Sequence, residues 1–547
     1  MTISHFSSYM RTSKLLQKVG TAFGLVAGLV SCLALAPVKT LAQTHDARVV
    51  PKGALRFSFA PVYDNYGQRF ALNNPNVIDG QPEPLGVDLT TDSTGTNLFP
   101  QIAASETAIQ DLIGDALYRI NAGAFNTIRD ADIRYFPFGF AYGLTDRLTV
   151  HAEIPLVTTR SQVTFSVDST GANVGLNLSD SLFGNLALAT DAQAFIAQLS
   201  NALVELETKI ADGTFGCPTN PLCLTAQTAR DKLLSVINNL SVLQGSNGTQ
   251  LFAPLASSSA GIWIINEIET LKSQLAGLGI LSAIAGNFPL PTEPVTAEDI
   301  NTILGATGLG FEADPIGFNR RTVFGDISVG VRYGLIQSPR FRVLVSGTMV
   351  LPTGDPAHAD NFVSLDAGDG QMDAVVGLEA AIEPRGGVGI TFGASYTAQL
   401  SHSISRRLGP PSLPIRPLSA QGEVRRDLGD IIQLNAYPFI NLSDGFRVFG
   451  SMSYFQKGND SYESAGIVDS DPWTVRSLEQ KTEMRVLSFG GGIAYRAERT
   501  MTERTLPIEA GLSISSAFTG SGGLTPRGSR TIIYLRLFFG KAQTQEN

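Results

Sequence analysis

Apolar and polar residues alternate along much of the second half of the chain. From Val323 to Leu335 the odd-numbered positions are mainly Val, Ile and Tyr, whereas the even-numbered positions include Asp326 and Arg332. The segments 341–351, 372–382 and 388–399 alternate in the same way. Because successive side chains of a strand point to opposite faces, this pattern predicts four strands, each with one apolar and one polar face. A few apolar residues fall on the polar parity, namely Phe324, Leu344, Val350, Val375 and Ala381.

Eight further segments have strand patterns, which brings the predicted number of strands to about twelve. They lie near 54–60, 130–142, 148–165, 431–440, 446–455, 485–496, 507–518 and 531–540. Segments of about ten residues are longer than the five or six residues usual in a soluble sandwich. Long alternating strands in an even number are typical of an outer-membrane barrel, where one face meets lipid and the other the lumen. The predicted fold is an all-β membrane protein, an antiparallel up-and-down barrel.

The lengths of the connections support the same fold. Those after the even strands are short, at about 143–147, 336–340, 383–387, 441–445 and 497–506. Those after the odd strands are longer, at about 61–129, 166–321, 353–371, 401–430, 456–484 and 519–530. An up-and-down barrel sorts its connections in this way, with short turns in the periplasm and long loops outside the cell. A sandwich with Greek-key crossings has no reason to do so.

Between about 179 and 310 the alternation gives way to apolar residues spaced by three and four, which is the helical pattern. Three stripes are present: Leu199, Leu203, Leu206 and Ile210; Leu233, Leu234, Ile237, Leu240 and Leu243; and Ile264, Ile268, Leu271 and Leu275. Asp180 and Thr225 are candidate N-caps of the first two helices. The order of the loops places this helical insert outside the cell, as a cap or a plug of the barrel. The predicted organisation is a signal peptide (1–42), the first strands with a long outer loop (43–178), the insert (179–310) and the remaining strands (311–547).

The N-terminus has the pattern of a secretory signal peptide. A basic stretch from Arg11 to Lys18 precedes an uncharged apolar run from Val19 to Leu35, and Thr40-Leu41-Ala42 offers small residues for cleavage. Two alternatives stay open: an uncleaved anchor, for which the run is short, and a lipoprotein attached at Cys32. Past residue 40 the sequence contains no uncharged apolar run of about eighteen residues, so helical membrane spans are not expected.

Composition narrows the function classes. The chain has 55 Gly, 30 Phe and 13 Tyr against 2 Trp, which suits many strands with aromatic girdles. The net charge of -9 argues against nucleic-acid binding, because phosphate neutralisation needs a basic stripe. Cys217 and Cys223 are the two cysteines outside the signal peptide, and we expect a structural disulfide between them rather than a redox pair.

The polar parity of the strands supplies the candidate lumen-lining residues. They are Arg134, His151, Glu153, Asp326, Arg332, Arg342, Asp373, Glu379, Arg447, Arg496, Glu509 and Arg536. Opposed charges in a narrow barrel form either a selectivity zone or a sealed network of salt bridges that holds the barrel in shape. Both interpretations stay open.

Catalytic and metal sites have weaker candidates. A barrel hydrolase needs an oriented Ser and His, but His45, His358 and His402 lie outside the strands and His151 is on the lumen parity. The loop residues Asp355, His358, Asp360, Asp366 and Asp369 are candidate ligands for a divalent cation, although such runs are usually solvated. Asp366 to Gly370 does not match an EF-hand, because Gly368 stands where an oxygen ligand is needed. We therefore expect no enzymatic activity, no cofactor and no metal.

Three segments carry a family resemblance. Tyr142 to Val150 reads YGLTDRLTV, Gly325 to Tyr333 reads GDISVGVRY, and Leu351 to Asp355 reads LPTGD. These resemble motifs of the outer-membrane transporter family named after the meta-pathway of phenol degradation. The resemblance covers about 130–165 and 320–400 and leaves out the helical insert. It implies a transporter-like outer-membrane β-barrel for hydrophobic or aromatic compounds and supplies no catalytic residues.

The expected function is a channel or transporter for a small, hydrophobic or aromatic solute in the bacterial outer membrane. The expected partners are outer-membrane lipid and lipopolysaccharide, the solute, and the barrel assembly machinery, which recognises terminal strands like that of Ile533 to Phe539; no nucleic acid is expected. Two alternatives are retained. One is a surface protein whose barrel anchors the insert for adhesion or partner binding, and the other is a lipid hydrolase.

Overall fold

The computed structural model describes residues 47–71, 80–96, 98–179, 186–245, 250–384, 387–410, 413–443, 445–464, 473–496, 508–522 and 525–540. The predicted signal peptide, the predicted N-cap Asp180 and the candidate His45 lie outside these residues.

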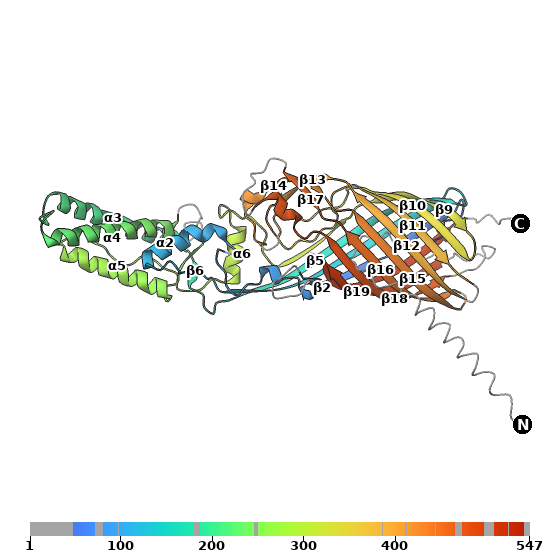
Figure 1. Cartoon of the computed structure of the whole chain (residues 1–547), viewed down its shortest axis with the longest axis horizontal. Helices are drawn as coiled ribbons and strands as arrows, with labels where there is room; N and C mark the ends of the chain where they lie inside the picture. The colour runs from blue at the N-terminus through green and yellow to red at the C-terminus, as the bar shows by residue number, and fades with distance from the viewer. Residues whose placement is uncertain are drawn as a thin grey trace, which may run out of the picture.

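Twelve antiparallel strand positions close into one barrel (Figure 1). Around the wall they are β1 (Leu55–Phe59) with β2 (Val62–Phe70), β4 (Ala124–Gly143), β5 (Leu148–Asp168), β8 (Phe318–Phe324) with β9 (Ser328–Gln337), β10 (Phe341–Val350), β11 (Asp373–Ile382), β12 (Val388–Gln399), β15 (Ile431–Ser443), β16 (Phe446–Lys457), β18 (Met484–Arg496), β19 (Ile508–Ser521) and β20 (Pro526–Phe539). Two wall positions consist of two strands each, because β1 and β2 both pair with β4 and β20, and β8 and β9 both pair with β5. The predicted fold and number of strands are confirmed.

The outer face of the barrel is apolar and rich in aromatic rings. On β4, Phe138, Phe140 and Tyr142 are exposed, whereas the intervening Ala141 is buried. The ring of Phe138 stacks on that of Phe59 on β1, with centroids 5.0 Å apart. Exposed apolar and aromatic side chains on alternate positions form the surface that a bilayer requires of a spanning strand. The apolar positions of the alternating sequence pattern are therefore the side chains that face lipid.

Residues 325–327 separate β8 from β9 and change which residues face the lumen. Odd-numbered residues face the lumen on β8, and even-numbered residues face it on β9. Val323 on β8 faces the lumen, since its register partner is Val157, whereas Phe324 faces outward and is 63% exposed. On β9 the even-numbered Arg332 faces the lumen instead. The single parity assumed from Val323 to Leu335 was wrong for this reason. The outward position of Phe324 explains its place on the polar parity.

The connections alternate in length as predicted, with one exception. Short turns join β4 to β5, β9 to β10, and β15 to β16 at one end of the barrel. The long connections leave from the other end, where the helices lie (Figure 1). The connection between β19 and β20 was expected to be long, but it covers only 522–525, because both strands extend further than their apolar pattern.

Two of the long connections build a small sheet that the sequence did not reveal. Its strands are β13 (His402–Arg407), β14 (Gln421–Asp427) and β17 (Ser461–Ser464), in the order β13–β14–β17. It covers a small apolar core that contains Leu408, Val424 and Val475. Shorter elements in the connections are β3 (Pro82–Pro84), β6 (Val174–Leu176), β7 (Phe252–Pro254) and the 3-10 turns Val87–Leu89, Pro100–Ile102, Leu418–Ala420 and Val475–Glu479.

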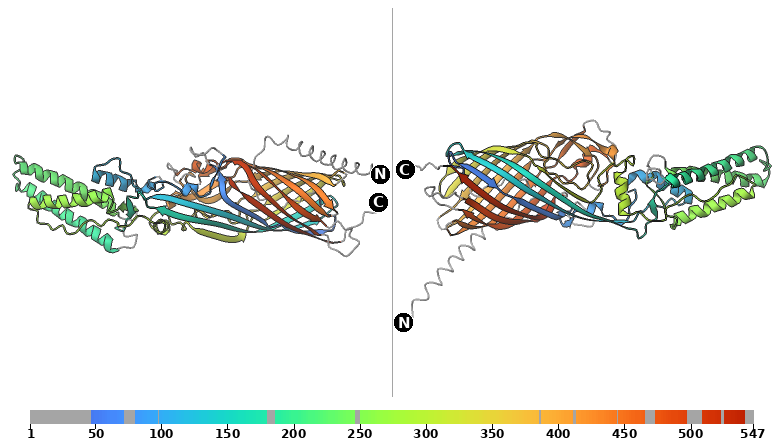
Figure 2. Two further views of the ribbon diagram at one scale, coloured as in Figure 1. Left: turned by 90° about the horizontal axis from the view of Figure 1, so that it is seen from below. Right: turned by 180° about the vertical axis from the view of Figure 1, so that it is seen from behind.

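The helices extend beyond the barrel, along its long axis (Figures 1 and 2). They are α2 (Ala103–Ile113), α3 (Leu186–Ala211), α4 (Pro221–Gln244), α5 (Ser259–Gly277) and α6 (Ala297–Gly305). We call this group the helical projection. The three predicted stripes lie on α3, α4 and α5, whereas α2 and α6 were not predicted. Among the described residues, no helix is both long and apolar enough to cross a membrane.

One continuous core holds the helical projection together. Leu199 on α3, Leu233 on α4 and Ile264 on α5 are all buried in it. Ile109 on α2 belongs to the same core, although α2 comes from the preceding long connection. The N-cap of α4 is Asn220, whose side chain accepts the backbone N–H of Leu222; the prediction of Thr225 was wrong because the helix begins one turn earlier, at Pro221.

Cys217 and Cys223 form a disulfide in the turn between α3 and α4. This turn lies at the end of the helical projection that is remote from the barrel (Figure 1). The bond closes a loop in which six residue steps separate the two cysteines.

Candidate functional site in the barrel lumen

All the predicted lumen residues except Arg134 point to the inside of the barrel. Most of them meet an oppositely charged partner there. Arg332 and Glu379 pair at 2.6 Å, and Glu509 lies 3.1 Å from both Arg496 and Arg536. Ionised groups are stable in such an interior when each is paired and hydrogen-bonded.

The other inward residues hold the wall through polar contacts. Glu153 accepts a hydrogen bond from the hydroxyl of Tyr135 at 3.0 Å, and His151 Nε2 lies 3.2 Å from the hydroxyl of Thr348. Asp373 is buried, with the amide of Gln371 at 3.5 Å.

Arg134 faces outward, which corrects its place among the lumen-lining candidates. It precedes Tyr135, which lines the lumen, and it shares its parity with the exposed Phe138 and Phe140. Its Nε donates to Asp132 Oδ1 at 3.1 Å on the same face of β4. The polar character of Arg134 did not indicate a lumen position. The apolar band on the outer face of β4 ends at Phe136, and beyond it charged residues occupy both faces of the strand.

The short-turn end of the lumen is filled. Glu383 pairs with Arg342 at 3.0 Å and with Arg447 at 3.3 Å. Residues 47–54 also enter the lumen there: Ala47 packs on Leu344 and Ala381, and the backbone N–H of Val50 donates to the hydroxyl of Thr149. This contact explains why two apolar side chains, Leu344 and Ala381, occur on the inward parity.

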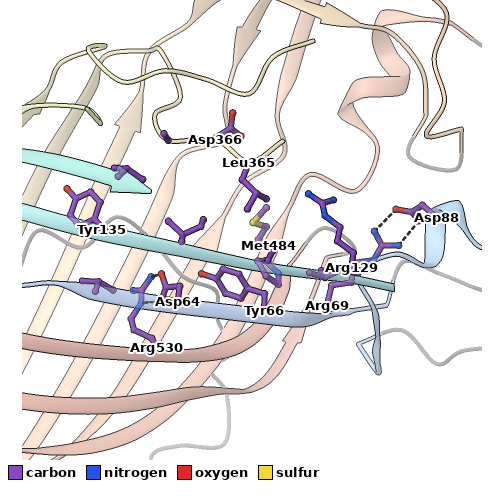
Figure 3. A pocket seen from close by; sticks show the side chains of 17 residues that line it. Asp64, Tyr66, Arg69, Asp88, Arg129, Tyr135, Leu365, Asp366, Met484 and Arg530 are labelled. Atoms are coloured by element: carbon purple, nitrogen blue, oxygen red, sulfur yellow. Dashed lines mark hydrogen bonds and ion pairs between the residues drawn. The ribbon is translucent and has the colours of Figure 1, made fainter. Parts of the chain in front are cut away.

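A cavity of about 560 Å³ occupies the lumen towards the long-loop end (Figure 3). Much of its wall is apolar, from Val62, Leu85, Ile133, Val157, Leu365 and Met484. Its charged groups are largely neutralised within the wall. Arg530 binds both oxygens of Asp64, at 2.7 and 2.8 Å, and Arg69 binds both oxygens of Asp88, each at 2.6 Å. A largely apolar wall with a few fixed polar groups is the usual lining of a site for small organic molecules.

The connection between β10 and β11, residues 351–372, folds inward and roofs this cavity. Arg321 on β8 donates to Asp355 Oδ2 at 2.7 Å and to the carbonyl of Leu365 at 2.6 Å. Arg129 on β4 donates to the carbonyl of Val363 at 2.9 Å. Two arginines of the wall therefore hold the loop in the lumen.

Two motifs of the sequence meet at the root of this loop. Asp326, from GDISVGVRY, accepts the backbone N–H of Gly354, from LPTGD, at 2.8 Å. The hydroxyl of Thr353 donates to the carbonyl of Gly325 and accepts the N–H of Ile327. The motifs therefore fasten the inward loop to the interruption between β8 and β9. This position gives Asp326 a structural partner in addition to its predicted place in the lumen.

Two smaller cavities adjoin the main one. A cavity of about 390 Å³ under the β13–β14–β17 sheet shares Asp88 and Asp366 with it. A cavity of about 90 Å³ deeper in the barrel shares Asp64, Tyr66 and Arg530 with it. The three cavities thus form a row from the long-loop end into the lumen.

The cavity under the small sheet has a charged lining, in which Arg406, Arg407 and Arg416 face Asp88, Asp366 and Asp460. Burial and the neighbouring Arg406 lower the pKa of Arg416 there to about 10. The guanidinium of Arg416 donates to the backbone carbonyls of Leu413 and Arg407. Burial also raises the pKa of Tyr462, in the same lining.

Three of the four carboxylates that the sequence offers as metal ligands are paired with arginines. Asp355 binds Arg321, Asp360 lies 2.8 Å from Arg407, and Asp366 lies 3.7 Å from Arg406. His358 lies 3.7 Å from Asp355. Within the described ranges no group of three or more His, Cys, Asp or Glu side chains could hold a metal ion. Nor does a serine hydroxyl there bond to a histidine; Ser401, beside His402, accepts from Arg425 instead.

Several residues of the main cavity were missed by sequence reasoning. Asp64, Tyr66 and Arg69 lie on β2, which falls within the long connection predicted at 61–129, and Arg129 and Arg530 lie just before predicted strands. The sequence did contain a pattern that indicates several of these positions. The even-numbered residues of the neighbouring segments 54–60 and 531–540 face the lumen, and Asp64, Tyr66, Arg530 and Ile532 continue that even-numbered series.

A closed twelve-stranded barrel with an apolar, aromatic outside and an ion-paired inside defines the class of the protein. It is an outer-membrane β-barrel, and its location is the bacterial outer membrane.

No family model matches the chain, and no curated protein matches it. Among solved structures, it is similar to an outer-membrane channel from Pseudomonas putida F1, with 8% identity over 91% of this chain and 100% of that chain and a TM-score of 0.38. It is also similar to the toluene transporter TbuX of Ralstonia pickettii, with 9% identity over 90% of each chain and a TM-score of 0.29. For the Pseudomonas putida toluene transporter TodX the values are 12% identity, 93% and 96% coverage and 0.26. The class is defined by the barrel itself.

Proposed function

We propose that the protein is a channel or transporter that carries small hydrophobic or aromatic solutes across the outer membrane. The observation that carries the proposal is the row of three cavities, which leads from the long-loop end into the lumen. On this proposal the long connections and the helical projection lie outside the cell, and the short turns lie in the periplasm. The toluene transporters among the similar structures suggest which solutes to test first.

The lining of the main cavity favours an uncharged solute. Asp64 with Arg530 and Asp88 with Arg69 satisfy each other, so a solute does not need to neutralise them. Apolar contact with Ile133, Val157 and Met484 remains as the main source of binding energy. The inward loop and residues 47–54 narrow the two ends, so passage requires one or both of them to move.

A substitution that fills the main cavity tests this function. Ala131→Trp places an indole ring inside the cavity, since Ala131 is buried in its wall. Uptake of toluene into vesicles that contain the purified protein should fall strongly. Ala394→Trp is the matched control: it adds the same ring on the outward parity of β12 and should leave uptake unchanged. Equal uptake by both variants and the native chain would contradict the proposal.

A second function is favoured by the position of the helices. Because α3, α4 and α5 lie beyond the barrel (Figure 2), the barrel would serve as an anchor that presents them to a partner. Conductance distinguishes the two functions. A channel gives discrete events in a planar bilayer, whereas an anchor gives none, even when the inward loop is displaced.

A further inference from the structure

We propose that the outer wall of the barrel carries a binding site for the phosphorylated headgroup of an outer-leaflet lipid, formed by Arg134, Arg160 and Arg320. We call these three residues the wall arginines. The inference uses the orientation proposed above but not the identity of the transported solute.

The wall arginines lie side by side on three neighbouring strands. In the barrel register, Asp132 on β4 is opposite Arg160 on β5, and Arg160 is opposite Arg320 on β8. Arg134 follows on the same face of β4, and both Arg134 and Arg160 form ion pairs with Asp132. One carboxylate therefore serves two of the three guanidinium groups.

The remaining cation creates an unfavourable contact. Arg320 is exposed and forms no ion pair with any described residue. It lies directly opposite Arg160, and like charges directly opposite each other on neighbouring strands destabilise a sheet. Asp130, on the same face of β4 and opposite Gln162, compensates only in part, since three arginines face two aspartates. An anion between Arg160 and Arg320 would relieve the repulsion.

The height of the wall arginines matches the headgroup layer. From Arg134 to the end of β4 at Gly143 there are nine residue steps. At a rise of about 3.3 Å per residue and a strand tilt of about 40°, these steps cover about 23 Å of membrane normal, close to the ~25 Å apolar band of such barrels. Phe136, Phe138 and Phe140 occupy the band below Arg134. The wall arginines thus lie at its outer edge.

The chemistry of the wall arginines selects phosphate on a lipid. A guanidinium presents a planar fork of N–H donors that binds phosphate oxygens in pairs. Below Arg134, Phe59 on β1 and Phe136 and Phe138 on β4 form a stack of rings on the outer face, against which an acyl chain can lie. A molecule with phosphate above and acyl chains below matches both surfaces, and a phosphorylated glycolipid of the lipid A type has this form.

The test counts lipids bound to the purified full chain by native mass spectrometry. Bisphosphorylated lipid A is titrated against the native chain and against Arg320→Gln, which leaves both ion pairs of Asp132 in place. We expect lipid A to bind the variant about tenfold more weakly, since a charge-assisted contact to phosphate is lost. Arg485→Gln is the control, because Arg485 is an exposed arginine on β18 away from the wall arginines and should bind lipid A as the native chain does.

Asp132→Asn gives a result of opposite sign. Without its carboxylate the wall arginines are free for phosphate, so lipid A should bind more tightly. If the three arginines only held the wall together, this variant would gain no lipid. Heat-modifiable migration on a gel verifies that each variant is folded.

Three outcomes would overturn the proposal. The first is equal binding of lipid A by the native chain, Arg320→Gln and Asp132→Asn. The second is equal binding of dephosphorylated lipid A, which would assign the interaction to the acyl chains. The third is displacement of lipid A by inorganic phosphate at the same concentration, which would reveal a site for free phosphate instead.

Discussion

Glu509 on β19 is shared by two arginines from the two neighbouring strands. Its oxygens lie 3.1 Å from Arg496 on β18 and 3.1 Å from Arg536 on β20. Glu383, which follows β11, is shared by Arg342 on β10 and by Arg447 on the more distant strand β16. A shared carboxylate ties three strands together, so its loss affects more of the wall than the loss of either arginine.

This asymmetry can be measured at Glu509. Glu509→Gln should lower the free energy of unfolding by about 1–3 kcal/mol, because the buried Arg536 and the half-buried Arg496 both lose a charged acceptor. Arg496→Met should lower it by less, since Glu509 keeps Arg536. Urea titration of the folded barrel in detergent micelles measures both. A larger loss for Arg496→Met would show that Glu509 depends on one partner only.

Glu205 on α3 makes the helical projection sensitive to acid. It accepts the backbone N–H of Leu281 and both the N–H and the hydroxyl of Ser282. The N–H of Leu281, together with the other contacts, lowers the pKa of Glu205 from 4.5 to about 2. Because the folded pKa lies below the unfolded value, the stabilisation is complete above pH 4.5 and is lost as the pH falls from 4.5 to 2.

Hydrogen exchange tests this pH dependence. The exchange rates are first corrected for the pH dependence of intrinsic amide exchange. The amides of 278–286 should then be less protected at pH 3 than at pH 6. Glu205→Gln should remove most of that difference, because the amide does not titrate. A native chain whose protection is equal at both pH values would refute the assignment.

At the scale of elements, the inward loop depends on a close approach of two glycines. A Cβ atom on Gly368 would lie 2.5 Å from Gly354 Cα, and one on Gly354 would lie 2.7 Å from Gly368 Cα. Such distances leave no room for any side chain at either position. Gly354 of the LPTGD segment is therefore required because the end of the loop packs directly against its beginning.

Gly368→Val should displace the loop and leave the barrel intact. The expected result is a higher single-channel conductance in planar bilayers, with heat-modifiable migration unchanged. Gly347→Ala is the control, since a Cβ there meets nothing within 4 Å. Unchanged conductance in Gly368→Val would mean that the loop does not limit the lumen.

The sequence predicted the elements that face lipid and missed those that face other loops. The twelve wall positions were readable because lipid and lumen impose opposite chemistries on alternate residues, as at Phe138 and Ala141, although β2 was not predicted in the position that it shares with β1. The strand β13 was missed, since a loop sheet has no lipid side and its His402 and Arg406 are both polar. The roles of Arg129 and Arg321 were also hidden, because their acceptors are carbonyls of a loop far away in the chain.

At the scale of the whole molecule, α3, α4 and α5 lie outside the lumen, beyond the end of the barrel. The described core of the helices reaches the barrel strands at Phe125 and Val163, near the ends of β4 and β5, and it reaches the inward loop at Val363. The chain leaves and returns at one place, since the carbonyl of Glu293 lies 2.2 Å from where a Cβ of Gly175 would be. This closeness allows the helices to be removed and the gap to be bridged.

Replacement of 178–290 by a short glycine linker should leave a folded barrel of unchanged conductance. The reason is that the lumen is narrowed by 351–372 and 47–54 rather than by α3, α4 or α5. Planar-bilayer recording of the native and shortened chains measures this. A larger single-channel conductance in the shortened chain would show that the helices plug the barrel, which is one of the two positions that the sequence predicts for the insert.

The connection between β5 and β8 is very long, yet its length adds little to the entropic penalty of folding. The entropic penalty of closing a loop grows only with the logarithm of its length, so extending a connection from about 20 to about 150 residues adds roughly 2 kcal/mol. The long pairing of β4 with β5, from Ala124 to Gly143, easily offsets such a term. This junction is consequently a place where the barrel can accept a foreign folded domain at little thermodynamic penalty, and the same scaffold can display very different surfaces.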